Sequence, residues 1–151
     1  MSIETIMTKQ PVCCSPSDTV QRVAQMMRQQ DVGAIPVVSD LVSKRLVVII
    51  TDRDLSISAI ADGKDPQTTP IDAYFTRNVI TCSPDDTLDA CEQKMKQHRI
   101  RRIPVVDKQN SCVGIVVQAD IARVEKPESF QALITEISRP NIKRPTPIAA
   151  A

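Results

Sequence analysis

The stretch Ile35–Val38, with the sequence IPVV, occurs a second time as Ile103–Val106. The match extends beyond these residues, because Ile3–Ser39 aligns with Ile71–Asp107 without a gap and fourteen of the aligned residues are identical. About two identities would arise by chance from average residue usage. This self-similarity predicts that the chain consists of two copies of one small structural unit.

Each copy carries the same series of secondary-structure signals. A short β-rich segment leads into Ser-Pro and then Thr, which is a typical helix entry. An amphipathic helix, two apolar runs and a second helix follow, and this second helix starts after Thr51 or Val117. The expected strands are Val12–Cys14, Ala34–Val38 and Leu46–Ile50 in the first copy and Ile80–Cys82, Ile103–Val106 and Cys112–Val117 in the second. We predict an α/β (α+β) fold of two pseudo-symmetric β-α-β-β-α units, packed sheet to sheet because one unit of about 55 residues has too small a core alone.

The remaining segments divide the chain. Phe130, Leu133, Ile134 and Ile137 have helical spacing, which predicts an amphipathic helix at Glu128–Ser138. The following residues contain three prolines and predict a flexible or polyproline-like tail. The expected divisions are unit 1 at 1–63, a polar linker at 64–70, unit 2 at 71–125, and the C-terminal helix and tail at 126–151.

Composition excludes several classes of function. The 151 residues carry a formal net charge of only +1, so we expect no nucleic-acid partner. The aromatic residues are only Tyr74, Phe75 and Phe130, too few for a platform that stacks bases. Leu46–Ile50 and Val113–Val117 are too short to span a bilayer, and the N-terminus lacks a secretory signal. We therefore expect a cytoplasmic protein with no membrane contact.

The five cysteines do not indicate a metal or redox site. Their odd number and the absence of an export signal favour reduced thiols. No CxxC pair is present and His98 is the single histidine, so no metal site is expected. Cys14 and Cys82 occupy equivalent repeat positions and are expected in the core, in preference to a thiol switch. The pair Met26–Met27 is expected in the core or at a dimer interface.

Thr51 and Asp54 stand where an apolar run meets the next helix. One interpretation is a helix cap, with Thr51 as the N-cap and Asp54 three residues later. The other is a ligand site, because a carboxylate can accept hydrogen bonds from both vicinal hydroxyls of a ribose. If the two copies face each other, both side chains would point into the cleft between them.

The repeat resembles a pair of CBS domains (the cystathionine β-synthase type), the arrangement called a Bateman module, over about residues 3–124. The residues that carry the resemblance are Pro36–Val38, Ile49–Leu55, Pro104–Asp107 and Gly114–Ile121. The resemblance, to stand-alone bacterial or archaeal proteins of this type, implies two clefts for AMP, ADP, ATP, S-adenosylmethionine or a related adenosyl ligand. It also implies a disc-like homodimer.

The resemblance further implies which residues form each cleft. The main cleft would combine Ile49, Thr51 and Asp54 with Ile80, Ile100 and Arg101. The weaker cleft would combine Val12, Val32, Gly33, Val117 and Asp120. Val117 stands where the family expects Ser or Thr. The hydrogen bond from that hydroxyl to the ligand is then lost, which weakens binding by about 0.5–1.5 kcal/mol. The main cleft also departs from the family pattern. Val48 stands at the repeat position where the second copy has Gly114, and its side chain would narrow the space for a ligand.

A basic cluster, His98–Arg102, adjoins the main cleft. It is either a solvated helix end, where cations are favoured, or a phosphate-binding group in which Arg101 and Arg102 take part. The resemblance supports the second interpretation, and Arg53 is a further candidate. His98 itself is expected to be a solvated helix residue.

No nucleophile–base pair, metal cluster or glycine-rich phosphate loop is visible, so we expect no catalytic residues, no catalytic cofactor and no enzyme activity. The prediction is a regulatory module that binds an adenosyl ligand between its units and signals to a partner protein through its dimer conformation. One alternative is an interaction or scaffold protein whose clefts are closed by Val48 and Val117. Another is a nucleic-acid-binding variant that uses Arg99–Arg102, which would bind with steep salt dependence.

Overall fold

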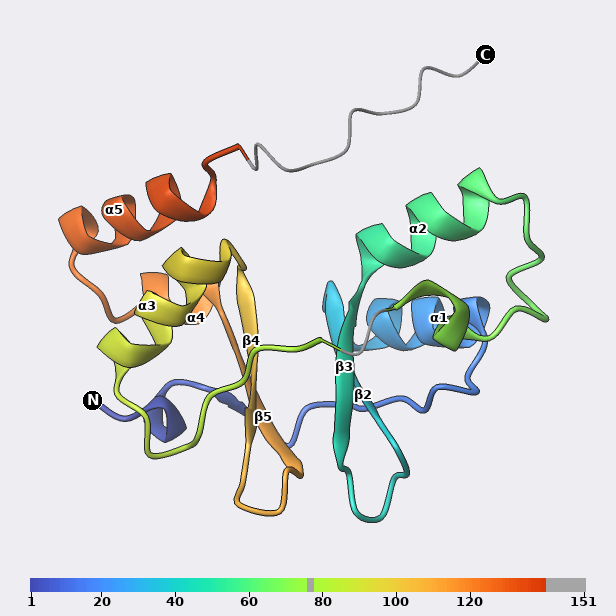
Figure 1. Ribbon diagram of the computed structural model, residues 1–151, viewed down its shortest axis with the longest axis horizontal. Helices are drawn as coiled ribbons and strands as arrows, with labels where there is room; N and C mark the ends of the chain where they lie inside the picture. The colour runs from blue at the N-terminus through green and yellow to red at the C-terminus, as the bar shows by residue number, and fades with distance from the viewer. Residues whose placement is uncertain (76–77, 141–151) are drawn as a thin grey trace.

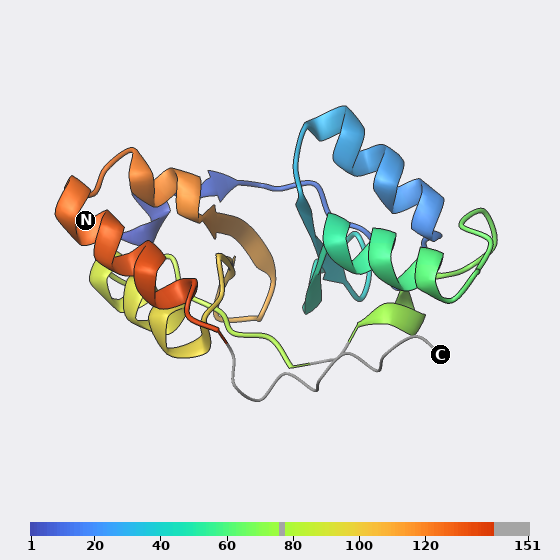
Figure 2. The ribbon, with the colours of Figure 1, turned by 90° about the horizontal axis from the view of Figure 1, so that it is seen from above.

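The computed structural model describes residues 1–75 and 78–140. Two small sheets face each other at the centre of the molecule, and helices cover their outer sides (Figures 1 and 2). The first half contains α1 (Val20–Gln30), β2 (Ala34–Val38), β3 (Leu46–Thr51) and α2 (Asp52–Ala61). The second contains α3 (Leu88–His98), β4 (Arg102–Val106), β5 (Cys112–Val117), α4 (Gln118–Ala122) and α5 (Pro127–Ile137). The predicted α/β fold of two pseudo-symmetric units is confirmed.

The repeat extends to the details of the two hairpins and helix entries. β2 and β3 pair antiparallel with a register shift at Val37/Val38, and β4 and β5 pair with the same shift at Val105/Val106. Thr19 Oγ1 accepts a hydrogen bond from the Arg22 N–H at the start of α1 (3.2 Å). Thr87 caps α3 in the same way. The predicted helix entries are therefore confirmed.

The predicted short strands at Val12–Cys14 and Ile80–Cys82 are wrong in extent. Each segment forms a single parallel bridge, Cys14 to Val37 and Cys82 to Val105. The pairing stops there because the next residues turn: the Ser15 N–H donates to Asp18 Oδ2 (2.8 Å), and the proline between them has no N–H for a ladder. Both cysteines are nevertheless buried, as expected for core residues.

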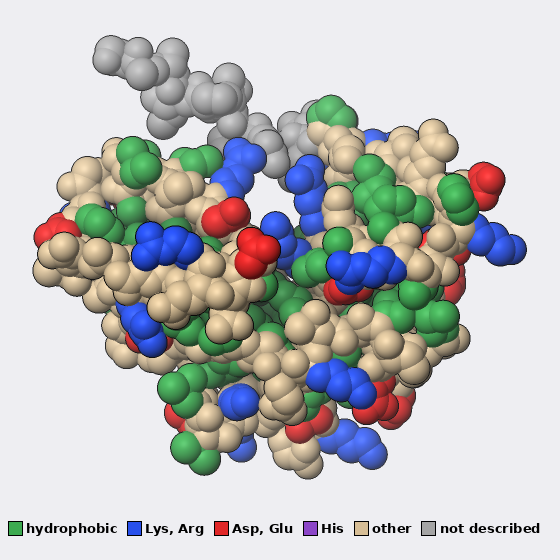
Figure 3. All heavy atoms as spheres, turned by 180° about the vertical axis from the view of Figure 1, so that it is seen from behind, with side chains coloured by type: hydrophobic (Ala, Val, Ile, Leu, Met, Phe, Trp, Pro, Cys, Tyr) green, Lys and Arg blue, Asp and Glu red, His purple; other side chains and the backbone are tan. Residues whose placement is uncertain are grey.

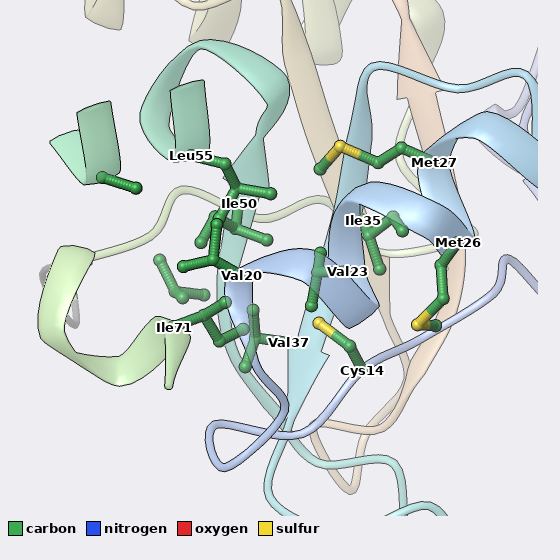
Figure 4. Close-up of a cluster of buried hydrophobic side chains, with 12 residues drawn as sticks. Cys14, Val20, Val23, Met26, Met27, Ile35, Val37, Ile50, Leu55 and Ile71 are labelled. Atoms are coloured by element: carbon green, nitrogen blue, oxygen red, sulfur yellow. The ribbon is translucent and has the colours of Figure 1, made fainter. Parts of the chain in front are cut away.

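The core of each half is completed by the first residues of the other copy. Ile3, in the turn η1 (Ile3–Thr5), is buried in the core of the second half, whereas Ile71, in η2 (Ile71–Tyr74), is buried in the core of the first. Figure 4 shows Ile71 against Val20 and Val37. The strand β1 (Thr8–Lys9) also crosses over and pairs with β5. The divisions expected at 1–63, 64–70, 71–125 and 126–151 stay a prediction. The cores do not coincide with them, because Ile3 and Ile71 each pack in the core of the other half.

A small apolar cluster and a set of backbone hydrogen bonds join the two sheets. Val38 and Leu46 of the first half pack with Cys112 of the second. The Leu46 N–H donates to the Asn110 carbonyl (2.9 Å), and the Cys112 N–H donates to the Lys44 carbonyl (2.8 Å). The expected sheet-to-sheet packing therefore rests on shared burial and on paired backbone groups. These contacts hold the two halves in one arrangement.

The helix α5 lies beside α3, outside the two repeats (Figure 2). It covers Pro127–Ile137, one residue earlier than predicted at each end. Leu133 and Ile137 are buried in the core of the second half, and Phe130 packs against that core. Met26 and Met27 lie in the core of the first half. Residues 141–151 of the expected tail lie outside the described residues. No described helix has the length and apolarity needed to cross a membrane.

Candidate functional site

A cavity of about 310 Å³ opens between the two halves, at the low end of the volume range of ligand pockets. One wall comes from β3 and the start of α2, with Ile49 and Asp54. The other comes from β4 and the residues that lead into it, with Ile100 and Arg102, and from the segment before α3, with Ile80. The structure thus brings together five of the residues expected in the main cleft. Most of the lining is apolar, which suits a flat base, and Asp54 is its one acidic residue.

Thr51 and Asp54 form a complete capping box at the start of α2. Thr51 Oγ1 accepts from the Asp54 N–H (3.1 Å), and Asp54 Oδ2 accepts from the Thr51 N–H (3.0 Å). The helix-cap interpretation is therefore confirmed. The cap occupies one carboxylate oxygen, whereas Oδ1 accepts no hydrogen bond from the described residues. The cap thus fixes the Asp54 carboxylate at the cavity, with Oδ1 unpaired among the described residues.

The cavity continues outward into a wider, basic part of about 1,030 Å³. Ile49, Ile100 and Arg102 line both parts, so the inner and outer parts adjoin each other. The outer lining is rich in arginine and also contains Thr51 and residues from the ends of α3 and α5. Figure 3 shows Lys and Arg side chains gathered around a notch between the two halves. We call the joined inner and outer parts the main cleft.

The expected basic residues all line the outer part: Arg53 from α2, and His98, Arg101 and Arg102 from the end of α3 and the start of β4. Arg99 ends α3 in the left-handed conformation (φ 52°), which turns the chain from the helix into β4. Arg102 reaches toward the first half, since a Cβ on Gly33 would lie 3.3 Å from Arg102 Nη2. The basic cluster therefore faces the cleft. His98 is exposed in the last turn of α3.

The residues expected in the weaker cleft are arranged differently. Asp120 is buried, and both carboxylate oxygens are occupied: Oδ2 accepts from the Val117 N–H (2.9 Å) and Oδ1 accepts from Arg123 Nη1 (3.0 Å). Val117 has no hydroxyl to complete the cap. Val12 packs against the first core, and Val32 is exposed. Gly33 lies beside Arg102, so a side chain of the main cleft occupies the space next to it.

Several lining residues were missed from the sequence. Tyr74, Phe75 and Asn78 line the inner part because η2 packs on the first half. The only signal was that two of the rare aromatic residues are adjacent. Val48, expected to narrow the cleft, is buried in the first core and lines the inner part. Its counterpart Gly114 has a separate role, because a Cβ there would lie 2.4 Å from Met7 Sδ.

A sequence model of the CBS domain matches residues 3–58 and 71–126. The chain belongs to the CBS domain family. The two matches together form a CBS pair, as the resemblance implied, and α5 lies beyond the second match. Helix α5 is therefore an addition to the CBS pair, and its end borders the main cleft.

Relatives and solved structures support the same assignment. The CBS domain-containing protein YhcV of Bacillus subtilis is 40% identical over 142 residues, covering 93% of this chain and 98% of that protein. A crystal structure of Hypoxic Response Protein I with two coordinated zinc ions aligns with a TM-score of 0.74 and 32% identity, over 83% of this chain and 100% of that one. A CBS domain pair in complex with 5′-methylthioadenosine and S-adenosyl-L-methionine aligns with a TM-score of 0.72 and 32% identity, over 82% of this chain and 98% of that one. Among residues 1–75 and 78–140 of this chain, no three His, Cys, Asp or Glu side chains group as metal ligands.

Proposed function

We propose that this CBS pair is a non-catalytic regulatory module that binds an adenine nucleotide or related adenosyl ligand in its main cleft. The observation that carries the proposal is the position of Asp54. Its carboxylate lines the apolar inner part, and Thr51, its partner in the cap, lines the basic outer part. Among the described residues, none donates a hydrogen bond to Asp54 Oδ1. A nucleotide has the same order of groups, with a flat base, a ribose with two hydroxyls, and phosphate.

The cleft supplies a matching group for each part of such a ligand. The base would pack between Ile49, Ile80 and Ile100, where burial of apolar surface stabilises the complex. The ribose hydroxyls would donate to Asp54 Oδ1, and the Thr51 hydroxyl could donate to the ligand while its oxygen caps α2.

The phosphate end would meet the basic residues. Arg53, Arg101 and Arg102 would hold phosphate, since a guanidinium presents paired N–H donors in a fixed geometry. The solved CBS pair that contains S-adenosyl-L-methionine and 5′-methylthioadenosine supports an adenosyl ligand as a property of such pairs.

The proposal extends to the assembly and to signalling. Ile57 and Ile60 on α2 are 52% and 78% exposed, and they would be covered in a homodimer. A ligand between the halves contacts both, so it would favour one angle between them and change the dimer surface that a cytoplasmic partner protein reads. The second cleft would bind more weakly, because both oxygens of Asp120 already have partners.

A thermal-shift panel tests the proposed function. AMP, ADP, ATP and S-adenosylmethionine would be added to the wild type, Asp54→Ala and Asp120→Ala. A ligand at one hundred times its dissociation constant should stabilise the wild type by about 2.7 kcal/mol. Asp54→Ala should lose the shift, whereas Asp120→Ala should retain it. No shift with any of the four at millimolar concentration would contradict the proposal and favour a scaffold with closed clefts.

A further inference from the structure

The end of helix α5 forms part of the outer wall of the main cleft. The burial of Leu133 and Ile137 in the second core fixes the helix, so its last residues are held in place. The chain then continues along the cleft, where Ser138, Arg139 and Pro140 join the lining. Arg99 Nη1 donates to the Pro140 carbonyl (2.8 Å), which ties the end of α5 to the end of α3. These residues lie outside both CBS domain matches.

The outer part carries more positive charge than one phosphate group requires. Its lining contains five arginines and one histidine, and no aspartate or glutamate. Arg102 also lines the inner part and is therefore placed for the phosphate nearest the ribose. Arg99 and Arg139 line only the outer part, together with the end of α5. A chain of two or three phosphates would extend outward along these residues.

Arg139 is held by an exchangeable partner. Its Nε lies 3.1 Å from Glu136 Oε2, and its side chain is 62% exposed. An exposed ion pair of this kind contributes little to stability. A phosphate oxygen also forms charge-assisted hydrogen bonds with a guanidinium, so it could replace the exposed Glu136 carboxylate at low cost.

We propose that Arg139, at the end of α5, binds the distal phosphate of a nucleoside di- or triphosphate whose nucleoside lies in the main cleft. Helix α5 is then a part of the ligand site and makes the cleft prefer polyphosphates to a monophosphate. This inference rests on the proposed function, because it places the base and ribose at Ile49, Thr51 and Asp54.

Calorimetric titration with AMP, ADP and ATP tests the inference on the wild type and Arg139→Gln. Arg123→Gln is the matched control. Arg123 is also exposed and paired with an acid three residues away, but that acid is Asp120, which belongs to the weaker cleft. Arg139→Gln should weaken ATP binding about fivefold and leave AMP binding within about twofold. Arg123→Gln should leave both affinities of the main cleft unchanged, because Arg123 pairs with Asp120 of the weaker cleft. Glu136→Gln, which releases Arg139, should strengthen ATP binding about twofold.

Amide hydrogen exchange gives an independent readout. ATP should slow exchange at the end of α5 in the wild type, and AMP should not. An equal effect of Arg139→Gln on AMP and ATP, or no effect on either, would overturn the inference and leave the proposed function standing if Asp54→Ala still abolishes binding. A wild type that binds none of the three nucleotides would overturn both.

Discussion

Asp54 and Asp120 hold equivalent positions at the starts of α2 and α4, yet their carboxylates have different partners. Each accepts one hydrogen bond from the N-cap backbone, from Thr51 or Val117. The remaining oxygen of Asp120 is paired with Arg123, whereas Oδ1 of Asp54 accepts no hydrogen bond from the described residues. The same local motif therefore begins a helix in both halves, but only in the main cleft does it leave a carboxylate oxygen without a hydrogen bond from the described residues.

The opposing walls of the two clefts differ as well. Arg101 and Arg102 line the main cleft, and the equivalent positions in the first copy are Gly33 and Ala34. A duplicated backbone can thus present two arginines to one cleft and neither arginine at the equivalent positions of the other. Charge-assisted contacts are worth more than neutral ones, so these arginines should decide which cleft holds a phosphate.

After the loss of binding expected for Asp54→Ala, the largest effect is expected from Arg102→Ala. This change gives the main cleft the residue that the first copy has at the same repeat position, Ala34. It should weaken AMP binding by about 2–3 kcal/mol, because a charge-assisted contact to phosphate is lost. Calorimetric titration measures the change, with Arg123→Ala as the control. Equal losses in the two variants would show that the clefts do not differ in this way.

A smaller effect is expected from a methyl group added to β5 of the second half. In Gly114→Ala the new Cβ would lie 2.4 Å from Met7 Sδ, so Met7 must move from β5. We expect a loss of about 1–3 kcal/mol in the free energy of unfolding, measured by chemical denaturation. Met7→Ala in the same background should recover part of that loss. Full stability of Gly114→Ala would contradict the close packing of Met7 on this strand.

The two copies also differ at Glu92, whose repeat counterpart is the exposed Ala24. Glu92 is buried with Oε1 unpartnered by any described residue. Burial raises its pKa to about 7, and Glu125 and Asp89 add to the rise while Lys96 opposes it. Because the folded state holds this proton more tightly than the unfolded chain, stability should fall as pH rises from about 4.5 to 7.

Glu92→Gln should remove that pH dependence. At pH 8 it should raise the free energy of unfolding by about 1–2 kcal/mol, because no charge is then buried. Near pH 4.5 the two proteins should be almost equally stable. Denaturation curves at both pH values provide the measurement, and a variant that is less stable than the wild type at pH 8 would refute the prediction.

The smallest effect is expected from Val117→Thr. This change restores the hydroxyl that caps α2 in the first copy, so it should stabilise α4 by about 0.5–1 kcal/mol. Affinity for AMP should stay unchanged, because the second oxygen of Asp120 remains paired with Arg123. Thermal denaturation and titration together separate these outcomes. A gain of a second binding site would mean that the missing hydroxyl alone had closed the weaker cleft.

The features that sequence reasoning predicted well are local ones. The helix caps at Thr19, Thr51 and Thr87 depend on residues within one turn, so spacing is enough to find them. The resemblance to a CBS pair implied that Asp54 lies opposite Ile80 and Ile100, and all three line the inner part of the main cleft. The position at which a strand ends is less local. A single turn after Cys14 was enough to reduce the expected strand to one bridge.

The features that were missed depend on non-local choices. Nothing in the pattern around Ile3 and Ile71 shows that each packs on the other half, because both halves offer a similar apolar surface. Arg139 was missed for a related reason. It lies outside the repeat and reaches the cleft only because α5 packs on the second core.

The central claim is that the main cleft, and not its counterpart, holds the ligand. Calorimetric titration of the wild type, Asp54→Ala and Asp120→Ala with ATP measures it most directly, because the stoichiometry counts occupied clefts per chain. We expect one strong site per chain in the wild type, the same site in Asp120→Ala, and its loss in Asp54→Ala. A strong site that survives Asp54→Ala and disappears in Asp120→Ala would contradict the account.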